Sequence, residues 1–231
     1  YHPDLITIGG GPQMSPLPEE AIELGGFDVI VNREGEDIIG QLSDTLLDYK
    51  ESPMLHSYLE KIPGISFMRD GGLVQTRRSG LVSPDFVELP DFRSIKDLTS
   101  SYPMAGGVLE TVRGCTESCT YCQVIQQFLG YRLIDRETET KRLLQLQELA
   151  SDGLIHVSGN GRFTVFISDD LHTPPLRAVK YRNERLERLK SWKGRTDDMY
   201  LICQARAEIG QDLELAESMQ EANIKMLYLG V

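Results

Sequence analysis

Three cysteines lie close together in the tract RGCTESCTYC, residues 113–122: Cys115, Cys119 and Cys122. The chain has four cysteines in all, too few for a disulfide scaffold in 231 residues. Three thiolates with the spacing C-x3-C-x2-C can turn toward one metal centre, because the loop that carries them is short. The tract therefore predicts a metal site, built on zinc or on an iron–sulfur cluster.

Zinc is the less favoured of the two. A structural zinc site needs four protein ligands, and no second pair of ligands accompanies the tract. The alternation of the predicted strand 199–208 places Cys203 on the face opposite Gln204 and Arg206, so we expect Cys203 in the core. Three cysteines favour a [4Fe-4S] cluster with one iron open to another ligand. The histidines are scattered: His2, His56, His156 and His172.

The first part of the chain predicts two strand–helix units. Strands are expected at 5–10 and 28–31, and amphipathic helices at 17–24 and 36–49. This order implies a parallel sheet. Two units are too few for a complete α/β domain, and the chain begins at Tyr1 without a methionine, so we expect a fragment of a longer protein.

Residues 51–107 have the character of a linker. They contain a predicted hairpin around Asp70, Gly71 and Gly72, followed by a connector rich in proline and serine. From residue 108 onward strands and helices alternate again. The predicted helix that ends near Trp192 has a start signal in Thr173 and Pro174. Strands are expected at 108–112, 162–170, 199–208 and 225–231, and helices at 136–150, 173–192 and 212–222. This pattern predicts a partial (β/α) barrel.

The cysteine tract resembles the signature of the radical S-adenosylmethionine (SAM) superfamily. Its spacing, with Tyr121 just before the last cysteine, follows a short strand at the start of a predicted barrel. The resemblance implies that Cys115, Cys119 and Cys122 ligate a [4Fe-4S] cluster. It also implies that SAM chelates the open iron and is cleaved to methionine and a 5′-deoxyadenosyl radical.

The flanking sequence resembles one subgroup of this superfamily, whose members carry a cobalamin-binding domain before the barrel. The implied fold is α/β: the C-terminal part of a Rossmann-like cobalamin-binding domain at 1–50, a linker with a β-hairpin at 51–107, and a truncated TIM-type radical SAM barrel at 108–231. In the subgroup a glycine pair that matches Gly9 and Gly10 lies against the cobalamin, since glycine allows a close backbone approach.

Other positions match family sites that contact SAM. The backbone of Tyr121 corresponds to an adenine contact, and Gln204 and Arg206 to ribose or carboxylate contacts. Many relatives carry Gly-Gly-Glu at the end of the second barrel strand, where this chain has Ser-Asp-Asp. Carboxylates there can still accept hydrogen bonds from an ammonium group or from ribose hydroxyls. The residues of this last motif are Ser168, Asp169 and Asp170.

The predicted function is that of a cobalamin-dependent radical SAM enzyme that transfers a methyl group to an unactivated carbon. The first alternative is a radical SAM enzyme of another reaction type, such as cyclisation, rearrangement or thiolation, with a non-functional cobalamin domain. The second is a non-enzymatic iron–sulfur or zinc protein. The expected partners are a small-molecule or peptide substrate and an electron donor such as flavodoxin or ferredoxin. No catalytic side chain is indicated by the sequence.

Composition restricts the partners further. The formal net charge of −11 disfavours binding of a polyanion such as nucleic acid. The sequence contains neither a long apolar run that could cross a membrane nor a secretory signal. We therefore expect a cytoplasmic protein that binds neither nucleic acid nor membranes.

Overall fold

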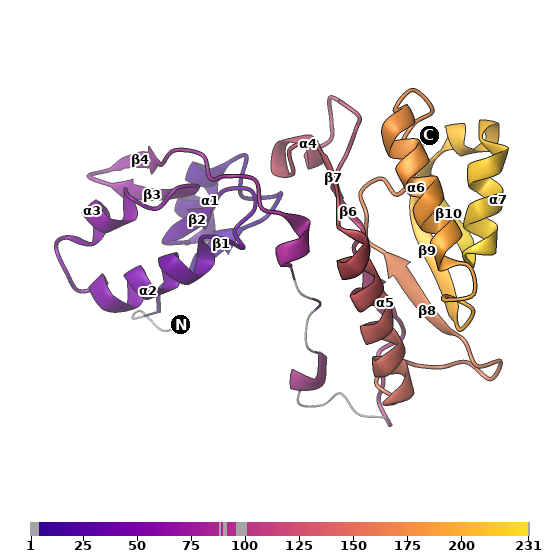
Figure 1. Ribbon diagram of the computed structural model, residues 1–231. Helices are drawn as coiled ribbons and strands as arrows, with labels where there is room; N and C mark the ends of the chain where they lie inside the picture. The colour runs from indigo at the N-terminus through magenta and orange to yellow at the C-terminus, as the bar shows by residue number, and fades with distance from the viewer. Residues whose placement is uncertain (1–4, 88, 90–91, 96–100, 231) are drawn as a thin grey trace. The chain divides into compact units, whose positions relative to one another are not determined.

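The computed structural model describes residues 5–87, 89, 92–95 and 101–230, and it divides into two compact units (Figure 1). Unit 1 comprises Tyr1–Val82 and Glu117–Leu129, and unit 2 comprises Ser83–Thr116 and Gly130–Val231. The chain thus leaves unit 2 within the cysteine tract, contributes a short segment to unit 1, and returns. The predicted strand 225–231 includes Val231, which lies outside the described residues.

Unit 1 contains a four-stranded sheet in the order β1-β2-β3-β4. The first two strands are parallel, as the strand–helix pattern predicts, and β3 joins β2 in an antiparallel arrangement. Asp70 and Gly71, both with positive φ, form the predicted hairpin turn between β3 and β4. The hairpin is therefore part of the unit 1 sheet. The elements are β1 (Ile8–Gly10), α1 (Pro18–Gly25), β2 (Val29–Val31), α2 (Ile39–Tyr49), α3 (Leu55–Leu59), β3 (Ile65–Arg69), β4 (Gly72–Gln75) and α4 (Val124–Gln127).

Unit 2 is built on a four-stranded parallel sheet in the order β10-β9-β8-β5, with a two-stranded antiparallel ribbon of β6 and β7 beside it. Two 3₁₀ helices, η1 (Pro84–Phe86) and η2 (Phe92–Ser94), precede the sheet. The strands and helices are β5 (Gly107–Leu109), β6 (Val112–Gly114), β7 (Tyr131–Leu133), α5 (Arg136–Ser151), β8 (Phe163–Ile167), α6 (Val179–Trp192), β9 (Met199–Arg206), η3 (Ala207–Gln211), α7 (Leu213–Glu221) and β10 (Ile224–Gly230).

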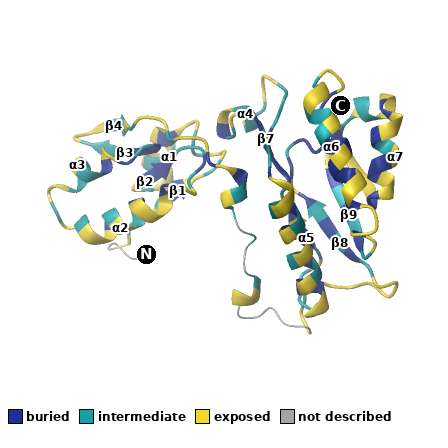
Figure 2. Cartoon of the chain, viewed as in Figure 1, coloured by how far each residue is buried: buried dark blue, intermediate teal, exposed yellow. Residues whose placement is uncertain are grey.

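Alternation along β9 separates the two faces of this sheet. Leu201, Cys203 and Ala205 are buried, whereas the intervening residues are half-buried or exposed. The buried face packs against the apolar sides of α5, α6 and α7, which form the largest core (Figure 2). Cys203 lies fully inside this core, and burial raises its pKa to about 12. The prediction that Cys203 is a core residue is confirmed.

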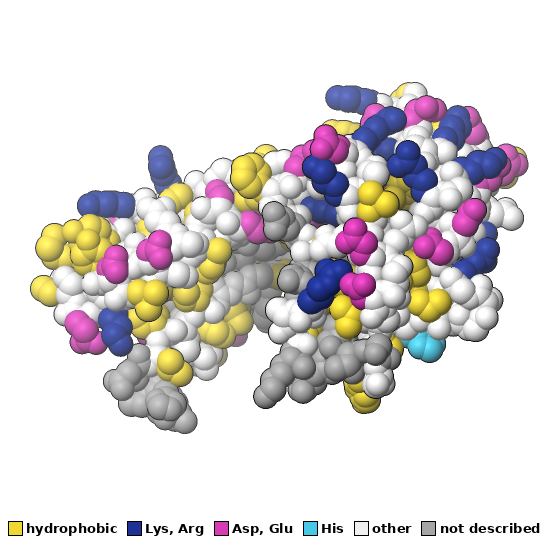
Figure 3. All heavy atoms as spheres, turned by 60° about the horizontal axis from the view of Figure 1, so that its bottom comes forward, with side chains coloured by type: hydrophobic (Ala, Val, Ile, Leu, Met, Phe, Trp, Pro, Cys, Tyr) yellow, Lys and Arg dark blue, Asp and Glu magenta, His cyan; other side chains and the backbone are white. Residues whose placement is uncertain are grey.

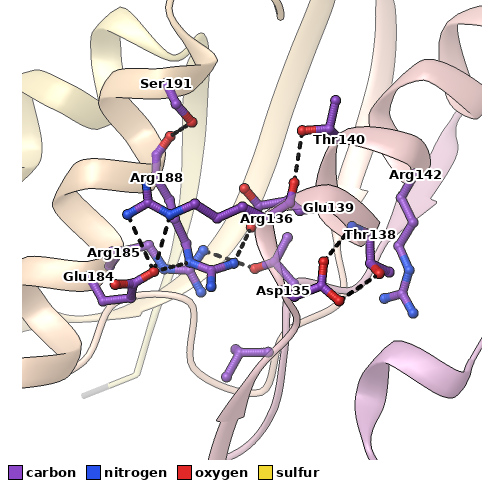
Figure 4. Close-up of polar contacts among 12 residues, drawn as sticks. Asp135, Arg136, Thr138, Glu139, Thr140, Arg142, Glu184, Arg185, Arg188 and Ser191 are labelled. Carbon is purple, nitrogen blue, oxygen red and sulfur yellow. Dashed lines mark hydrogen bonds and ion pairs between the residues drawn. The ribbon is translucent and has the colours of Figure 1, made fainter.

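A buried ion pair and a buried hydrogen bond hold α5 against α6, and the ion pair's residues are labelled in Figure 4. Arg188 Nη1 lies 3.0 Å from Glu139 Oε2, and Trp192 donates its indole N–H to Glu139 Oε1 at 2.7 Å. Glu184 accepts a hydrogen bond from Arg188 Nε at 3.0 Å. Since Glu139 is nearly fully buried, the donors from Arg188 and Trp192 offset the cost of removing its carboxylate from water. The two helices are thereby fixed behind the strands that carry the site.

The start signal at Thr173 and Pro174 does not begin a helix, so this prediction is wrong. Helix α6 begins at Val179. Thr173 precedes Pro174, which in turn precedes Pro175, and a residue before proline is disfavoured in the α region. The segment instead lies buried across the ends of the strands, where His172 N donates to Gln204 O at 3.1 Å.

The surface of unit 2 carries charges of both signs. On the face shown in Figure 3, Lys and Arg side chains are interspersed with Asp and Glu side chains. Lys190 illustrates this pattern, since its ammonium group lies 3.4 Å from carboxylate oxygens of both Glu187 and Glu214. Among the described residues, no helix has the length and apolar character required to cross a membrane.

Candidate functional site

The cysteine tract lies on the loop between the two strands of the antiparallel ribbon. Gly114 at the end of β6 pairs with Tyr131 at the start of β7. The loop begins at Gly114 with a φ of 85°, a left-handed conformation that glycine adopts more readily than other residues. Cys115 follows at once and packs against the apolar cluster of Val112, Tyr131 and Leu171. The ribbon thus holds the first cysteine firmly in unit 2.

The other two cysteines belong to the segment that contributes to unit 1. Cys122 N donates to Cys119 O at 3.1 Å, which closes a turn, and Tyr121 at its tip is 84% exposed. All three cysteines are half-buried, and all four in the chain carry reduced thiols. Within the described ranges, no three His, Cys, Asp or Glu side chains are assembled around a metal position. Three reduced, accessible thiols nevertheless match iron–sulfur chemistry as a donor set.

Asp169, at the end of β8, is fully buried in a polar network of unit 2. Its Oδ1 accepts hydrogen bonds from Thr111 N at 2.6 Å and Val112 N at 2.9 Å. Its Oδ2 lies 2.7 Å from His172 Nδ1 and 3.6 Å from Arg185 Nη2. The Asp169 carboxylate therefore ties the end of β8 to the start of the ribbon and is occupied by protein partners.

Electrostatics fix the charge states in this network. Burial alone would raise the pKa of Asp169, but the hydrogen bond from His172 and the charge of Arg185 outweigh it and hold the pKa below its usual value. Burial, and then the charge of Arg185, lower the pKa of His172 to about 4. Sequence reasoning missed Thr111 and Arg185, which lie far from Asp169 along the chain, and it did not connect His172 to Asp169 although only three positions separate them.

The neighbours of Asp169 are placed differently. Ser168 is exposed, and its N–H donates to Leu109 O at 2.8 Å. Asp170 is half-buried, and burial followed by the charges of Asp169 and Glu110 raises its pKa. Of the predicted Ser-Asp-Asp motif, the outer two residues are therefore accessible to a ligand.

Gln204 and Arg206 lie on the face of β9 opposite Cys203. Gln204 is exposed, and Arg206 donates through Nε to Glu208 Oε2 at 2.6 Å. The strands β8 and β9 are adjacent and parallel, so their carboxyl ends bring these residues to the same edge of the sheet as Ser168 and Asp170. In parallel α/β sheets this edge is where ligands bind.

The three glycines at the end of β1 and just after it, in unit 1, differ in what surrounds them. A Cβ on Gly9 would lie 2.7 Å from Met14 Sδ and 2.8 Å from Ile30 Cδ1, so this position has room for hydrogen alone. Gly10 has no atom closer than Val31 O at 3.4 Å. Gly11 has a φ of 86°, and its carbonyl accepts Ser15 N at 3.0 Å to form the turn.

A cavity of about 560 Å³ lies at the carboxyl ends of β1 and β2 in unit 1. Gln127 is 6% exposed at its edge and donates through Nε2 to Arg33 O at 2.6 Å. The side-chain oxygens of Gln127 and Asn32 are buried, and neither has a hydrogen-bond partner among the described residues. The cavity is lined by Pro12, Ser15, Pro16, Asn32, Arg33, Ser118, Cys119, Thr120, Cys122, Gln123, Ile125, Gln126 and Gln127.

Comparison with known proteins gives matches among solved structures. No family model and no curated protein sequence matches the chain. The cobalamin-dependent S-adenosylmethionine radical enzyme OxsB, solved with aqua-cobalamin and S-adenosylmethionine bound, superposes with a TM-score of 0.70 at 19% identity, over 98% of this chain and 31% of OxsB. The radical S-adenosylmethionine methyltransferase TsrM from Kitasatospora setae, solved with cobalamin and a [4Fe-4S] cluster, gives 0.65 at 15% identity, over 98% of this chain and 42% of TsrM.

These similarities concern the fold, since the identities are low. The chain spans less than half the length of either enzyme, 31% of OxsB and 42% of TsrM. Both superpositions cover 98% of this chain. The chain thus has the α/β fold of solved cobalamin-dependent radical SAM enzymes.

Proposed function

We propose that this chain belongs to a cobalamin-dependent radical SAM enzyme, and that Cys115, Cys119 and Cys122 ligate its [4Fe-4S] cluster. The observation that carries the proposal is the C-x3-C-x2-C tract, placed just beyond the first strand of a parallel sheet in a chain with this fold. When bound, the cluster would supply the electron that cleaves SAM, and cobalamin would supply a methyl group for an unactivated carbon.

The chain's own residues would hold and orient these groups. Gln204, Arg206, Ser168 and Asp170 lie at one edge of the unit 2 sheet, where they can bind the ribose, ammonium and carboxylate groups of SAM. Asp169 acts indirectly in this proposal, because its carboxylate holds the strand end that carries its neighbours. The exposed Tyr121 is left free to meet the adenine.

Cobalamin fits the cavity of unit 1 by its chemistry. The buried oxygens of Gln127 and Asn32 are acceptors without partners among the described residues, and the corrin periphery carries amide N–H donors. Gly10, two residues before Pro12 in the cavity lining, has backbone that a bulky ligand can approach closely. We also propose that the cobalamin-binding domain ends near residue 50 and that the barrel begins near residue 108. The electron donor would be a flavodoxin or a ferredoxin.

Anaerobic reconstitution with iron and sulfide tests the proposal. We expect about four irons per chain and a broad absorbance at about 400 nm that dithionite bleaches. Substitution of Cys115, Cys119 or Cys122 by alanine should remove most of the iron. The matched control is Cys203→Ala, which removes a buried core thiol and should leave the iron content unchanged.

The second readout is release of 5′-deoxyadenosine from SAM by the reconstituted protein. The third is methylation of a substrate that the protein binds. A colourless protein that retains zinc would contradict the cluster assignment. Equal iron loss in Cys203→Ala and in the three tract variants would show that the iron is bound nonspecifically.

A further inference from the structure

A second, smaller cavity in unit 1, of about 200 Å³, has two arginines in its lining, and the charge of each acts on the other. They are Arg33, which follows β2, and Arg78, which follows β4. Ser15, Ser79 and Gln75 add hydroxyl and amide groups, and no Asp or Glu side chain is among the described residues that line it. One water molecule occupies about 30 Å³, so the cavity accepts a small oxyanion but no macrocycle.

The two arginines lack the counter-charge that such a pair normally has. In the part of the chain that the structure describes, neither guanidinium forms an ion pair with an Asp or Glu side chain. Burial, and then the charge of Arg78, lower the pKa of Arg33, while the neighbouring Glu34 opposes this only in part. The chain as a whole has a net charge of −11, whereas this cavity is lined by two cations and no carboxylate. Its local charge is therefore opposite in sign to that of the chain.

The backbone around Arg33 is fixed. Arg33 has a φ of 68°, a left-handed conformation that non-glycine residues seldom adopt. Its N–H donates to Ser15 Oγ at 2.9 Å, and its carbonyl accepts Gln127 Nε2 at 2.6 Å. Backbone strain that is held in place by such contacts is concentrated at ligand-binding positions.

The segment that carries Arg78 is fixed as well. Gly64 N donates to Arg77 O at 2.7 Å, and Asn32 N donates to Gly64 O at 2.7 Å. A Cβ on Gly64 would lie 2.9 Å from the Ser79 side chain, so this glycine allows Ser79 to pack against the turn. Both arginines therefore line one cavity from anchored backbone.

We propose that Arg33 and Arg78 bind a phosphate group in this cavity. Guanidinium groups pair with phosphate oxygens through two parallel N–H donors, and two of them supply the charge that a phosphate dianion requires. The phosphate can come from the phosphodiester of a bound cobalamin or from a separate phosphorylated ligand. The binding of free phosphate does not depend on the proposed function, whereas the cobalamin source rests on it.

Titration of inorganic phosphate into the protein, followed by calorimetry, tests the site. We expect Arg33→Gln and Arg78→Gln each to weaken phosphate binding about tenfold or more. The matched control is Arg77→Gln. Arg77 is exposed and adjacent to Arg78, but it does not line the cavity, so this variant should change the affinity for phosphate less than about twofold. Because Arg78 is exposed, its variant should keep the fold even if Arg33→Gln does not.

Absence of phosphate binding by the wild-type protein, or an equal loss in the Arg77 and Arg78 variants, would overturn the site. A second set of titrations identifies the source. If cobalamin displaces phosphate but cobinamide, which lacks the phosphodiester, does not, the site binds the cofactor's own phosphate. If phosphate and cobalamin bind together, the site serves a separate phosphorylated ligand. Failure of cobalamin to bind at all would count against the proposed function and leave the phosphate result standing.

Discussion

The carboxyl ends of the strands in the two units differ in how their buried oxygen acceptors are satisfied. At the end of β8 in unit 2, Asp169 accepts hydrogen bonds from Thr111 and Val112 and lies beside Arg185, so its charge is fully compensated within the protein. At the ends of β1 and β2 in unit 1, by contrast, Gln127 has a buried oxygen without a described partner, and Arg33 has a guanidinium without a described counter-charge.

This difference indicates that the region around Asp169 positions the strand ends, whereas the cavities of unit 1 are the places where a ligand binds. The Asp169 carboxylate accepts protein donors at both oxygens and so holds the strand ends in place, although His172 Nε2 and Arg185 Nε and Nη2 in the same network have no hydrogen-bond partner among the described residues. A cavity with buried acceptors that have no described partner, and with arginines that have no described counter-charge, offers groups that a ligand can pair. We therefore expect substitutions in the first region to act mainly on stability, and those in the second to act mainly on ligand affinity.

The largest effect is expected from Arg185→Ala. Arg185 is fully buried, donates through Nη1 to Thr111 Oγ1 at 2.9 Å, and lies beside the Asp169 carboxylate. Its removal leaves a buried negative charge without a counter-ion, which should lower the free energy of unfolding by about 3–5 kcal/mol. Urea unfolding of the variant measures this loss.

Lys190→Ala provides the control on the same helix, α6. Lys190 is also paired with carboxylates, but its side chain is 47% exposed, so the loss should stay below about 1 kcal/mol. If the two variants lost similar amounts, the network around Asp169 would not hold the strand ends in place as we describe.

The second prediction concerns the pH dependence that His172 confers. Burial and the facing charge of Arg185 lower its pKa to about 4, although Asp169 opposes this, while the unfolded imidazole keeps its usual 6.5. The unfolded state therefore binds more protons between these values. The contribution of neutral His172 to the free energy of unfolding is fully present above about pH 6.5. It is lost as the pH falls toward 4, by about 3 kcal/mol in total.

His172→Gln should remove this part of the pH dependence. His156→Gln is the control, because His156 is exposed. Unfolding free energies measured at several pH values between 4 and 7 report the slope directly. A slope that survives in His172→Gln would assign the proton uptake to another group.

The network also shows what the sequence could and could not predict. Strand alternation placed Cys203 in the core, and Asp70 and Gly71 predicted the hairpin, because both signals are local in sequence. The contact between Thr111 and Asp169 joins residues 58 positions apart, and Arg185 comes from a helix behind the sheet. Spacing carries no information about such contacts.

The cysteine tract is a local signal of a different kind. Its spacing identifies the three candidate ligands, but the ribbon of β6 and β7 that frames the loop depends on pairing across 16 residues between Cys115 and Gly130, and the sequence did not predict it. Asp169 and Asp170 are likewise adjacent in sequence, yet their pKa values shift in opposite directions. Motif resemblance therefore gives residue types and order, whereas charge state and accessibility depend on tertiary contacts.

The smallest stability effects are expected in unit 1, where Gly9 and Gly10 separate fold from ligand. Gly9→Ala should lower the free energy of unfolding by about 1–3 kcal/mol, because its Cβ would lie within 2.8 Å of both Met14 and Ile30. Gly10→Ala has an ordinary contact at 3.4 Å and should stay within about 0.5 kcal/mol of the wild type.

Cobalamin titration should reverse this order. If the backbone at Gly10 faces the ligand, as we propose, the added methyl group in Gly10→Ala should weaken cobalamin binding even though the fold is intact. Gly9 faces the interior of unit 1, toward Met14 and Ile30, so Gly9→Ala should reduce binding only to the extent that it unfolds the protein. Wild-type affinity in a folded Gly10→Ala protein would place cobalamin away from this turn, since a close backbone approach is the only reason for a ligand to require glycine there.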